Sequence, residues 1–247
     1  MANQQIIKKI ALDTIVLESK SISNLSKVID SNFCKIINTL KVCNGKIVIT
    51  GIGKSAIIGM KISATLNSTG SKSIFLHLGE ALHGDIGVIG KDDIVICISK
   101  SGQSVEIESL SIYLKNAGIQ LIGISCVKDS LLYKFSDMFI HTEIDREACH
   151  NNLAPTTSSS CHLAIGDAIA MTLQKIKGFS PSDFSNYHPS GNLGKKLSLK
   201  LNNLIDPNRI PAVKLSSTFF EIIDEISSNM YGATAVIDSD KIIGIIT

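Results

Sequence analysis

The sequence has no long apolar run. Across its 247 residues, no uninterrupted apolar stretch approaches the roughly 18 residues that a membrane-spanning helix needs, although apolar residues make up 44% of the chain. Lys8 and Lys9 precede an apolar stretch near the N-terminus, but Asp13 and Glu18 interrupt it, which is not the pattern of a signal peptide. We therefore expect a cytoplasmic protein that makes no use of a membrane.

The sequence also lacks paired cysteines and a strong excess of either charge. None of its six cysteines forms a C-x-x-C pair, and without a signal peptide we interpret them as reduced and mainly structural. Cys149, directly before His150 in a polar stretch, is the one to follow. The formal net charge is +2 with acidic and basic residues interspersed, so we expect no nucleic-acid-binding surface.

What the sequence does contain is a regular alternation of strands and helices. After two helices within residues 3–42, short apolar runs rich in β-branched residues alternate with helical patterns. Such buried strands predict a parallel sheet covered on both faces, that is, a three-layer α/β sandwich whose functional sites lie at the carboxyl ends of the strands. The expected strands are 46–50, 73–77, 93–99, 119–126 and 138–142, and the expected helices are 55–68, 104–116, 131–135 and 156–177.

The pattern changes after about residue 200. Asn202-Asn203 and 206–208 have the composition of a linker. Beyond it we expect an amphipathic helix at 219–230 and two strands at 233–237 and 241–246, which are too little for an independent core. The predicted domains are therefore 1–200 and a small tail, 206–247.

A glycine-rich loop, residues 51–56 (GIGKSA), follows the first strand and opens a helix. It is not a Walker A loop, because Val48 stands where that motif needs glycine. It also matches the dinucleotide fingerprint G-x-G-x-x-A, but His77 and Leu78 occupy the strand end where that site wants an acid. What remains is an anion site at a helix N-terminus, with Lys54 as its cation.

Two hydroxyl clusters lie at other expected helix starts. Residues 99–104 (SKSGQS) follow the third strand, and residues 156–160 (TTSSS) open the long helix. Free N–H groups and hydroxyls at a helix start can hold a phosphate group, although serine-rich loops are often only helix caps.

Two histidines lie in loops rather than in apolar patterns. His83 stands between Glu80 and Asp85 in residues 79–85 (GEALHGD), and His188 precedes Pro189. Glu106 lies in the first turn of the helix after the Ser101 loop, where it could simply complement the helix dipole. His77, His141 and His162 fall in strand or helix patterns, and we interpret them as structural.

Taken together, these segments resemble the sugar isomerase (SIS) domain, and specifically the arabinose-5-phosphate isomerase family. The similarity runs in the family's order over roughly residues 40–200. The matching segments are GIGKS (51–55), STG (68–70), GEALHGDIG (79–87), ISKSGQSVEI (98–107), EAC (147–149), LAPTTSS (153–159), GDA (166–168), KGF (177–179) and HPSGNLGKKL (188–197).

The resemblance implies interconversion of D-ribulose 5-phosphate and D-arabinose 5-phosphate, which supplies Kdo for lipopolysaccharide. It implies no metal, no cofactor, and a homotetramer with sites near subunit interfaces. The catalytic group implied by the motifs is Lys54, His83, Glu106 and His188. The implied phosphate-binding residues are Ser55, Ser99, Ser101, Ser104, Thr157 and Ser158.

The sequence departs from the family in three places. Ser190 stands where the family usually has glycine, Cys149–Asn152 differ from the common Cys-Pro-Leu-Gly, and residues 206–247 resemble only the first part of a CBS pair. Two alternatives stay open: another SIS sugar-phosphate isomerase, or a non-catalytic sugar-phosphate-binding regulatory protein.

Overall fold

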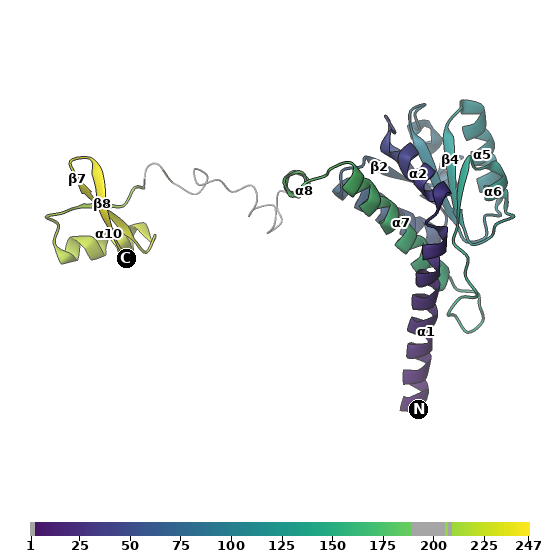
Figure 1. The fold of residues 1–247 in the computed structure, drawn as a ribbon, viewed down its shortest axis with the longest axis horizontal. Coiled ribbons are helices and arrows are strands. Elements are labelled where there is room, and N and C mark those ends of the chain that lie inside the picture. The colour runs from purple at the N-terminus through teal and green to yellow at the C-terminus, as the bar shows by residue number, and fades with distance from the viewer. Residues whose placement is uncertain (1–2, 189–205, 207–208) are drawn as a thin grey trace. The chain divides into compact units, whose positions relative to one another are not determined.

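The structure, a computed structural model, describes residues 3–188, 206 and 209–247. The chain divides into two compact units, Met1–His188 and Pro189–Thr247, and each is described by itself (Figure 1). The linker expected around 202–208 and most of the HPSG segment lie outside the described residues. The domain boundary between 200 and 206 therefore stays a prediction.

The first unit is built on a parallel five-stranded sheet with the order β2-β1-β3-β4-β5. Each strand lies within about one residue of the expected range, because a continuous apolar run bounded by turn residues marks a buried strand. The strands are β1 (Ile47–Gly51), β2 (Ser73–His77), β3 (Ile94–Ser99), β4 (Gln120–Ser125) and β5 (Met138–His141). The predicted α/β fold class is confirmed.

Helices cover both faces of this sheet (Figure 1). On one face pack α2 (Ser31–Lys41), α3 (Lys54–Ser68) and α7 (Thr157–Ile176), and α1 (Gln4–Asn24) contacts α7. The other face carries α4 (Leu78–Ala81), α5 (Val105–Ala117) and α6 (Leu131–Phe135). The remaining elements are the short helices η1 (Leu25–Val28), η2 (Asp85–Val88) and α8 (Pro181–Tyr187).

Successive strand residues supply the two halves of the core. In β1, Ile47 and Ile49 point to the α3 and α7 side, whereas Val48 points to the α5 side. All three are at most 2% exposed. The period of two explains why both faces of the sheet must be covered.

Sequence patterns missed α4, η2 and α8, which span at most seven residues each. One signal for α8 was available: Ser180 and Asp183 form a capping box around Pro181 at the first helical position. The other two have no comparable start or stop signal; α4 contacts β2 and α5, and η2 contacts α4.

The second unit is a small sheet with one helix. Its elements are β6 (Ala212–Lys214), α10 (Phe219–Asn229), β7 (Thr234–Asp238) and β8 (Lys241–Ile246). β6 pairs parallel and β8 antiparallel with β7. The sequence predicted the helix and two strands; β6 was missed because three residues are too short for a pattern. Among the described residues of this unit only Val213 and Thr234 are buried.

No helix in the described residues is both long and apolar enough to cross a membrane. The same residues contain no cluster of three or more histidine, cysteine or acidic side chains that could hold a metal ion.

We predict that Gly166→Ala destabilises the first unit. An added Cβ at Gly166 of α7 would lie 2.3 Å from Cδ1 of Ile62 in α3, a side chain only 2% exposed. Overpacking costs about 1–3 kcal/mol, which should exceed the ~1 kcal/mol that alanine gains over glycine as a helix former. Urea unfolding measures the difference.

Gly87→Ala is the matched control, because nothing lies within 4 Å of its added Cβ. A Gly166→Ala variant more stable than the parent protein would show that α3 and α7 are not in close contact.

Candidate functional site

The first element of the candidate site is the start of α3, after β1. Gly53 is the N-cap residue and has no side chain to satisfy the first N–H groups, and the first turn holds no acidic residue. Lys54 is exposed and Ser55 is half-buried in that turn. An anion at this helix start would meet free N–H groups and the Lys54 ammonium, as the sequence predicted.

The second element is the loop that joins β3 to α5. Within it the Gly102 N–H donates to the Ser99 hydroxyl (3.0 Å), and the Gln103 N–H donates to the Ser101 hydroxyl (3.3 Å). Gly102 has φ +64°, and an added Cβ would lie 2.5 Å from the Ser130 hydroxyl oxygen, so only glycine fits. Ser99 and Ser101 act as acceptors in these bonds, which leaves their O–H groups able to donate to a phosphate.

Ser104 and Glu106 form a local pair at the start of α5. Ser104 is the N-cap, and its hydroxyl accepts from the Ile107 N–H at 3.3 Å. The Glu106 side chain accepts hydrogen bonds from the Glu106 backbone N–H and from the Ser104 hydroxyl, and both lower the pKa of Glu106. The capping alternative is thus real for Ser104. Glu106 is half-buried, and its lowered pKa favours the carboxylate form.

The third element is the start of α7, where the structure reveals a residue to which sequence reasoning assigned no role. Glu147 is fully buried, with 0% of its side chain exposed. It accepts hydrogen bonds from the Ser158 hydroxyl (2.6 Å), the Ser158 N–H (3.2 Å) and the Thr156 N–H (2.8 Å). It also pairs with Lys100 Nζ at 2.9 Å.

Glu147 therefore joins two of the three elements, because Lys100 belongs to the Ser99–Ser104 loop and Ser158 to α7. Burial alone would raise its pKa, but the hydrogen bonds from Ser158, Thr156 and Lys100 outweigh burial and hold the pKa at about 2. The segment EAC (147–149) had marked the residue only as part of a family motif. Of its hydrogen-bond partners, Lys100 is far away in the sequence and Thr156 and Ser158 follow 9 and 11 residues later, so no short motif marks them.

This arrangement bears on the two predicted phosphate ligands of α7. Both donors of Ser158 already point at Glu147, whereas the Thr157 hydroxyl is buried and has no hydrogen-bond partner among the described residues. A buried hydroxyl without a partner costs free energy, which a ligand oxygen could recover. The phosphate-binding roles of Thr157 and Ser158 stay predictions.

The two predicted histidines lie apart from each other. His83 is exposed in the loop after α4, at the carboxyl end of the edge strand β2. His188 ends α8, where its Nδ1 lies 3.0 Å from the Phe184 carbonyl oxygen and its ring stacks on Phe184.

α8 is anchored at the opposite, amino edge of the sheet. The Phe179 ring lies beside Tyr187 of α8, and it also fills the space above Gly70, just after the end of α3. Fifteen residues of α3 separate that end from Lys54, a span of about 22 Å. One chain alone therefore does not bring His188 to the other predicted catalytic residues.

Two further interpretations can be compared with the structure. His162 is 1% exposed and lies 3.6 Å from the Cys126 sulfur, and burial lowers its pKa to about 4, which fits a neutral structural residue. Backbone hydrogen bonds from Ala154 and Leu153 lower the pKa of the Cys149 thiol.

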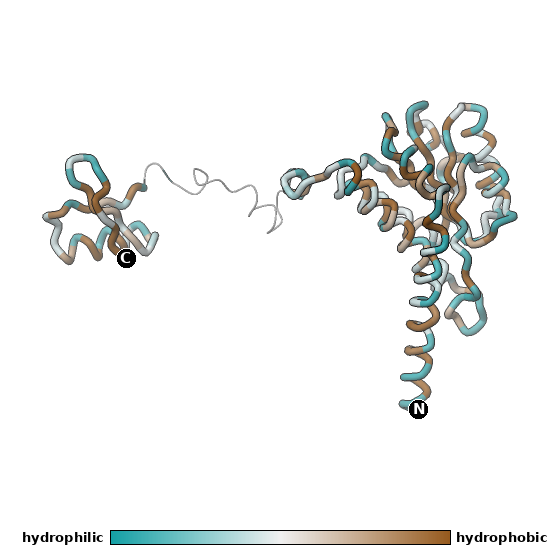
Figure 2. The backbone as a smooth tube through the Cα atoms, viewed as in Figure 1, coloured by the Kyte–Doolittle hydropathy of each residue, from teal (hydrophilic) through white to brown (hydrophobic). Residues whose placement is uncertain are grey.

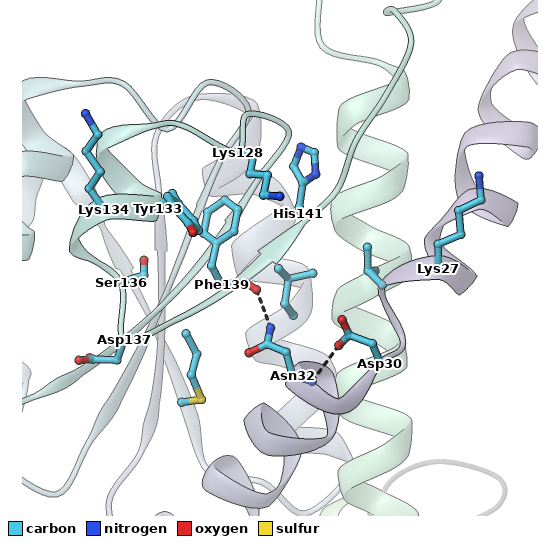
Figure 3. A pocket seen from close by; sticks show the side chains of 13 residues that line it. Lys27, Asp30, Asn32, Lys128, Tyr133, Lys134, Ser136, Asp137, Phe139 and His141 are labelled. Atoms are coloured by element: carbon cyan, nitrogen blue, oxygen red, sulfur yellow. Dashed lines mark hydrogen bonds between the residues drawn. The ribbon is translucent and has the colours of Figure 1, made fainter.

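A groove of about 580 Å³ runs along the open edge of β5 (Figure 3). Its lysines 27, 128 and 134 come from η1, the turn before α6 and α6 itself, and the Asn32 amide donates to the Phe139 carbonyl at 2.8 Å along the strand edge. None of the predicted site residues lines this groove. The candidate site is thus the set of loops at the carboxyl ends of β1, β3 and β5.

We predict that the free energy of unfolding of Glu147→Gln falls less steeply with decreasing pH than that of the parent protein. A folded-state pKa of about 2, below the value of an exposed glutamate, adds stability that is complete above about pH 5 and lost as the pH falls toward 2. The variant lacks this titration and loses about 2–3 kcal/mol at pH 7, because a charged hydrogen-bond acceptor is gone. Urea unfolding from pH 3 to 7 measures both effects.

The exposed Glu143, four residues earlier, gives the matched control Glu143→Gln. If the free energy of unfolding depended on pH equally in the two variants, the hydrogen bonds and ion pair of Glu147 would not hold its carboxylate ionised.

Comparison with known proteins gives the family. The SIS domain model matches residues 40–172. Arabinose 5-phosphate isomerase KdsD of Francisella tularensis is 42% identical over 241 residues, covering 96% of this chain and 74% of that protein. Arabinose 5-phosphate isomerase KpsF of Escherichia coli is 41% identical over 236 residues, covering 95% and 72%.

A solved structure agrees. A protein of E. coli CFT073 in complex with arabinose 5-phosphate has a TM-score of 0.73 and 38% identity, and the match covers 76% of this chain and all of that one. The motif-based resemblance is confirmed; a CBS identity for the tail is not tested by these matches. This chain belongs to the SIS domain family and, within it, to the arabinose 5-phosphate isomerases.

Proposed function

We propose that this protein is a cytoplasmic isomerase that interconverts D-ribulose 5-phosphate and D-arabinose 5-phosphate, the latter feeding Kdo synthesis for lipopolysaccharide. The observation that carries the proposal is about 40% identity, over nearly the whole chain, to relatives named arabinose 5-phosphate isomerase. The chemistry of the site supports it.

The phosphate group would bind where free donors gather at the carboxyl edge. Ser101 is exposed on the loop before α5, and Ser55 lies in the first turn of α3. Helix N-termini favour a dianion through their N–H groups and dipoles. The Glu147 carboxylate does not oppose phosphate binding as a free carboxylate would, because it is paired with the Lys100 ammonium and already accepts hydrogen bonds from Ser158 and Thr156.

The isomerisation passes a proton between C1 and C2 through a cis-enediol. It requires a base, and a cation or donor beside the enediolate oxygen. Glu106 is ionised and half-buried, and Lys54 stands at the neighbouring helix start with an exposed side chain. Glu106 or a histidine would be the base, and Lys54 would stabilise the oxyanion.

A direct assay tests the proposal. The purified chain is incubated with D-ribulose 5-phosphate, and formation of D-arabinose 5-phosphate is followed, with Lys54→Met as the inactive control. Turnover is the expected result. Binding of the sugar phosphate without turnover would favour a regulatory protein, and turnover of a different sugar phosphate would favour another SIS isomerase.

We propose that the enzyme is a homo-oligomer, in line with the homotetramer that the family resemblance implies. His188 sits at the amino edge of its own sheet, about the length of α3 away from Lys54. If His188 takes part in the reaction, it must therefore serve the site of another copy.

Helix α1 supports the same assembly. Its C-terminal half packs on α7, and the Ser160 hydroxyl donates to Glu18 at 2.7 Å. Its N-terminal half continues away from the sheet, with apolar and polar residues alternating along it (Figures 1 and 2). There Ile6, Ile7 and Ile10 are 55–61% exposed. Such a surface is typical of an interface between subunits.

We predict that Lys54→Met lowers kcat by about 10²–10³, whereas the affinity for the sugar phosphate changes less than about tenfold. The enediolate carries charge that the substrate lacks, so the ammonium stabilises the transition state more than the bound substrate. Steady-state kinetics and direct binding measurements separate the two effects.

Lys91 is an exposed lysine before β3, and Lys91→Met is therefore the control for a loss of charge alone. Equal losses of rate and affinity in Lys54→Met would make Lys54 a phosphate ligand only.

We predict that mixed oligomers of two inactive variants recover activity. In a hybrid of Lys54→Met and His188→Ala subunits, one site receives Lys54 from one chain and His188 from the other. If copies pair two by two, random mixing would restore about a quarter of the parental activity. Coexpression or refolding of the mixture, followed by the isomerase assay, measures it.

Mixing Lys54→Met with a Lys54→Met/His188→Ala double variant is the control, since no intact site can form. No recovery at any ratio in the first mixture would mean that His188 does not complete a neighbour's site.

A further inference from the structure

One histidine at the carboxyl edge of the first unit has an enclosed ring nitrogen that nothing in the described structure satisfies. His77 is the last residue of β2, and its Nδ1 is buried without a hydrogen-bond partner among the described residues. Two other histidines of strand or helix patterns do have polar neighbours: His141 Nε2 lies 3.1 Å from the Cys126 carbonyl oxygen, and His162 Nε2 lies 3.6 Å from the Cys126 sulfur. His77 therefore lacks the contacts that a purely structural histidine usually makes.

Pairing within the sheet places His77 beside the start of α3. His77 lies opposite Gly51 of β1, and an added Cβ at Gly51 would lie 3.2 Å from Cβ of Ser55. Earlier in the same strand, Phe75 packs against α3 at Gly59, four residues after Ser55. Because Phe75 and His77 lie on the same face of β2, the imidazole lies about one helical turn closer to the start of α3, near Ser55.

The Gly79 backbone decides which ring nitrogen of His77 carries the proton. A neutral imidazole has one N–H donor and one bare acceptor nitrogen. An added Cβ at Gly79 would lie 3.2 Å from Nδ1, so a Cα–H of this glycine points toward that nitrogen. A C–H group can face a bare nitrogen but offers nothing to an N–H donor. We therefore expect the proton on Nε2, the nitrogen on the less enclosed side of this half-buried residue.

Strand order separates His77 from the serine loop that is expected to hold the phosphate group. β1 lies between β2 and β3, so His77 lies about 10 Å from the end of β3, where the Ser99–Ser104 loop begins. Lys54 follows the intervening strand β1. A sugar whose phosphate group binds at the serine loop therefore extends past Lys54 toward His77, and the oxygens that reach the imidazole belong to the sugar carbons rather than to the phosphate group.

We propose that His77 is a further substrate-binding residue, whose Nε2–H donates a hydrogen bond to an uncharged oxygen of the sugar. The proposal rests on the proposed sugar-phosphate isomerase function, and it adds to the Lys54 ammonium a neutral donor from a second strand. A donor held at this position would orient the sugar carbons relative to the bound phosphate group, which favours reaction at C1 and C2.

Two amide substitutions distinguish the ring nitrogens. In His77→Gln the side-chain amide nitrogen can take the place of Nε2, whereas the shorter side chain of His77→Asn reaches only the position of Nδ1. We expect His77→Asn to lower kcat/KM for D-arabinose 5-phosphate by about tenfold, the effect of losing one neutral hydrogen bond, and His77→Gln to retain most of it. The affinity for inorganic phosphate, measured by calorimetry, should stay unchanged in both variants.

Equal kcat/KM values in the parent protein and both variants would overturn the proposal. Losses of equal size in His77→Asn and His77→Gln would indicate a structural role and would overturn it too. If the parent protein shows no turnover, the proposed function fails, and the same comparison is made with the affinity for D-arabinose 5-phosphate; a parent protein that does not bind this sugar phosphate would contradict both proposals.

Nitrogen-15 NMR of the parent protein tests the tautomer without any substitution. The account predicts that the His77 ring carries its proton on Nε2 in the free protein, and that the Nε2 resonance shifts when D-arabinose 5-phosphate is added but not when inorganic phosphate is added. A proton on Nδ1, or an Nε2 resonance that ignores the sugar phosphate, would contradict the assignment.

Discussion

The candidate site depends on a buried carboxylate. Glu147 is removed from water and still ionised, because the start of α7 and Lys100 supply the hydrogen bonds and charge that its burial requires. In return it ties the Ser99–Ser104 loop to α7. That loop, with three serines and a glycine of positive φ, is also held from β4 and α6, because Ser125, Cys126 and Leu132 donate hydrogen bonds to its Lys100 and Gly102 carbonyl oxygens. Order in the proposed phosphate-binding region thus depends in part on a residue that needs no contact with substrate.

The parallel sheet imposes a second constraint. All of its strands end at one edge, so the β1, β3 and β5 loops converge there, while the helices that follow carry the chain back to the other edge. His188 follows α7 and is held near Gly70 through Phe179 and Tyr187. The same topology that gathers Lys54 and Glu106 excludes His188 from their site within one chain. The proposed assembly of several chains would resolve this conflict, and the exposed isoleucines of α1 offer an apolar surface for it.

The fold could be predicted almost completely from the sequence because its signals are local. Apolar runs of four to six residues mark the five strands, and Gly118 and Gly178 end helices in the left-handed conformation. The positions of Lys54, Ser101 and Glu106 at the carboxyl edge followed from the same pattern. The role of Glu147 did not, because it arises from tertiary packing that brings Lys100 and Ser158 together. The position of His188 was likewise beyond sequence patterns, which do not fix the direction in which α8 leaves α7.

The most direct test of this account is an experimental structure of the protein with D-arabinose 5-phosphate bound. The account predicts a phosphate group bound by Ser101 and the start of an adjacent helix, with the Glu147 carboxylate still held by Ser158 and Lys100. A phosphate group bound elsewhere, for example in the groove along β5, or a Glu147 side chain turned out to replace those contacts with substrate, would contradict it.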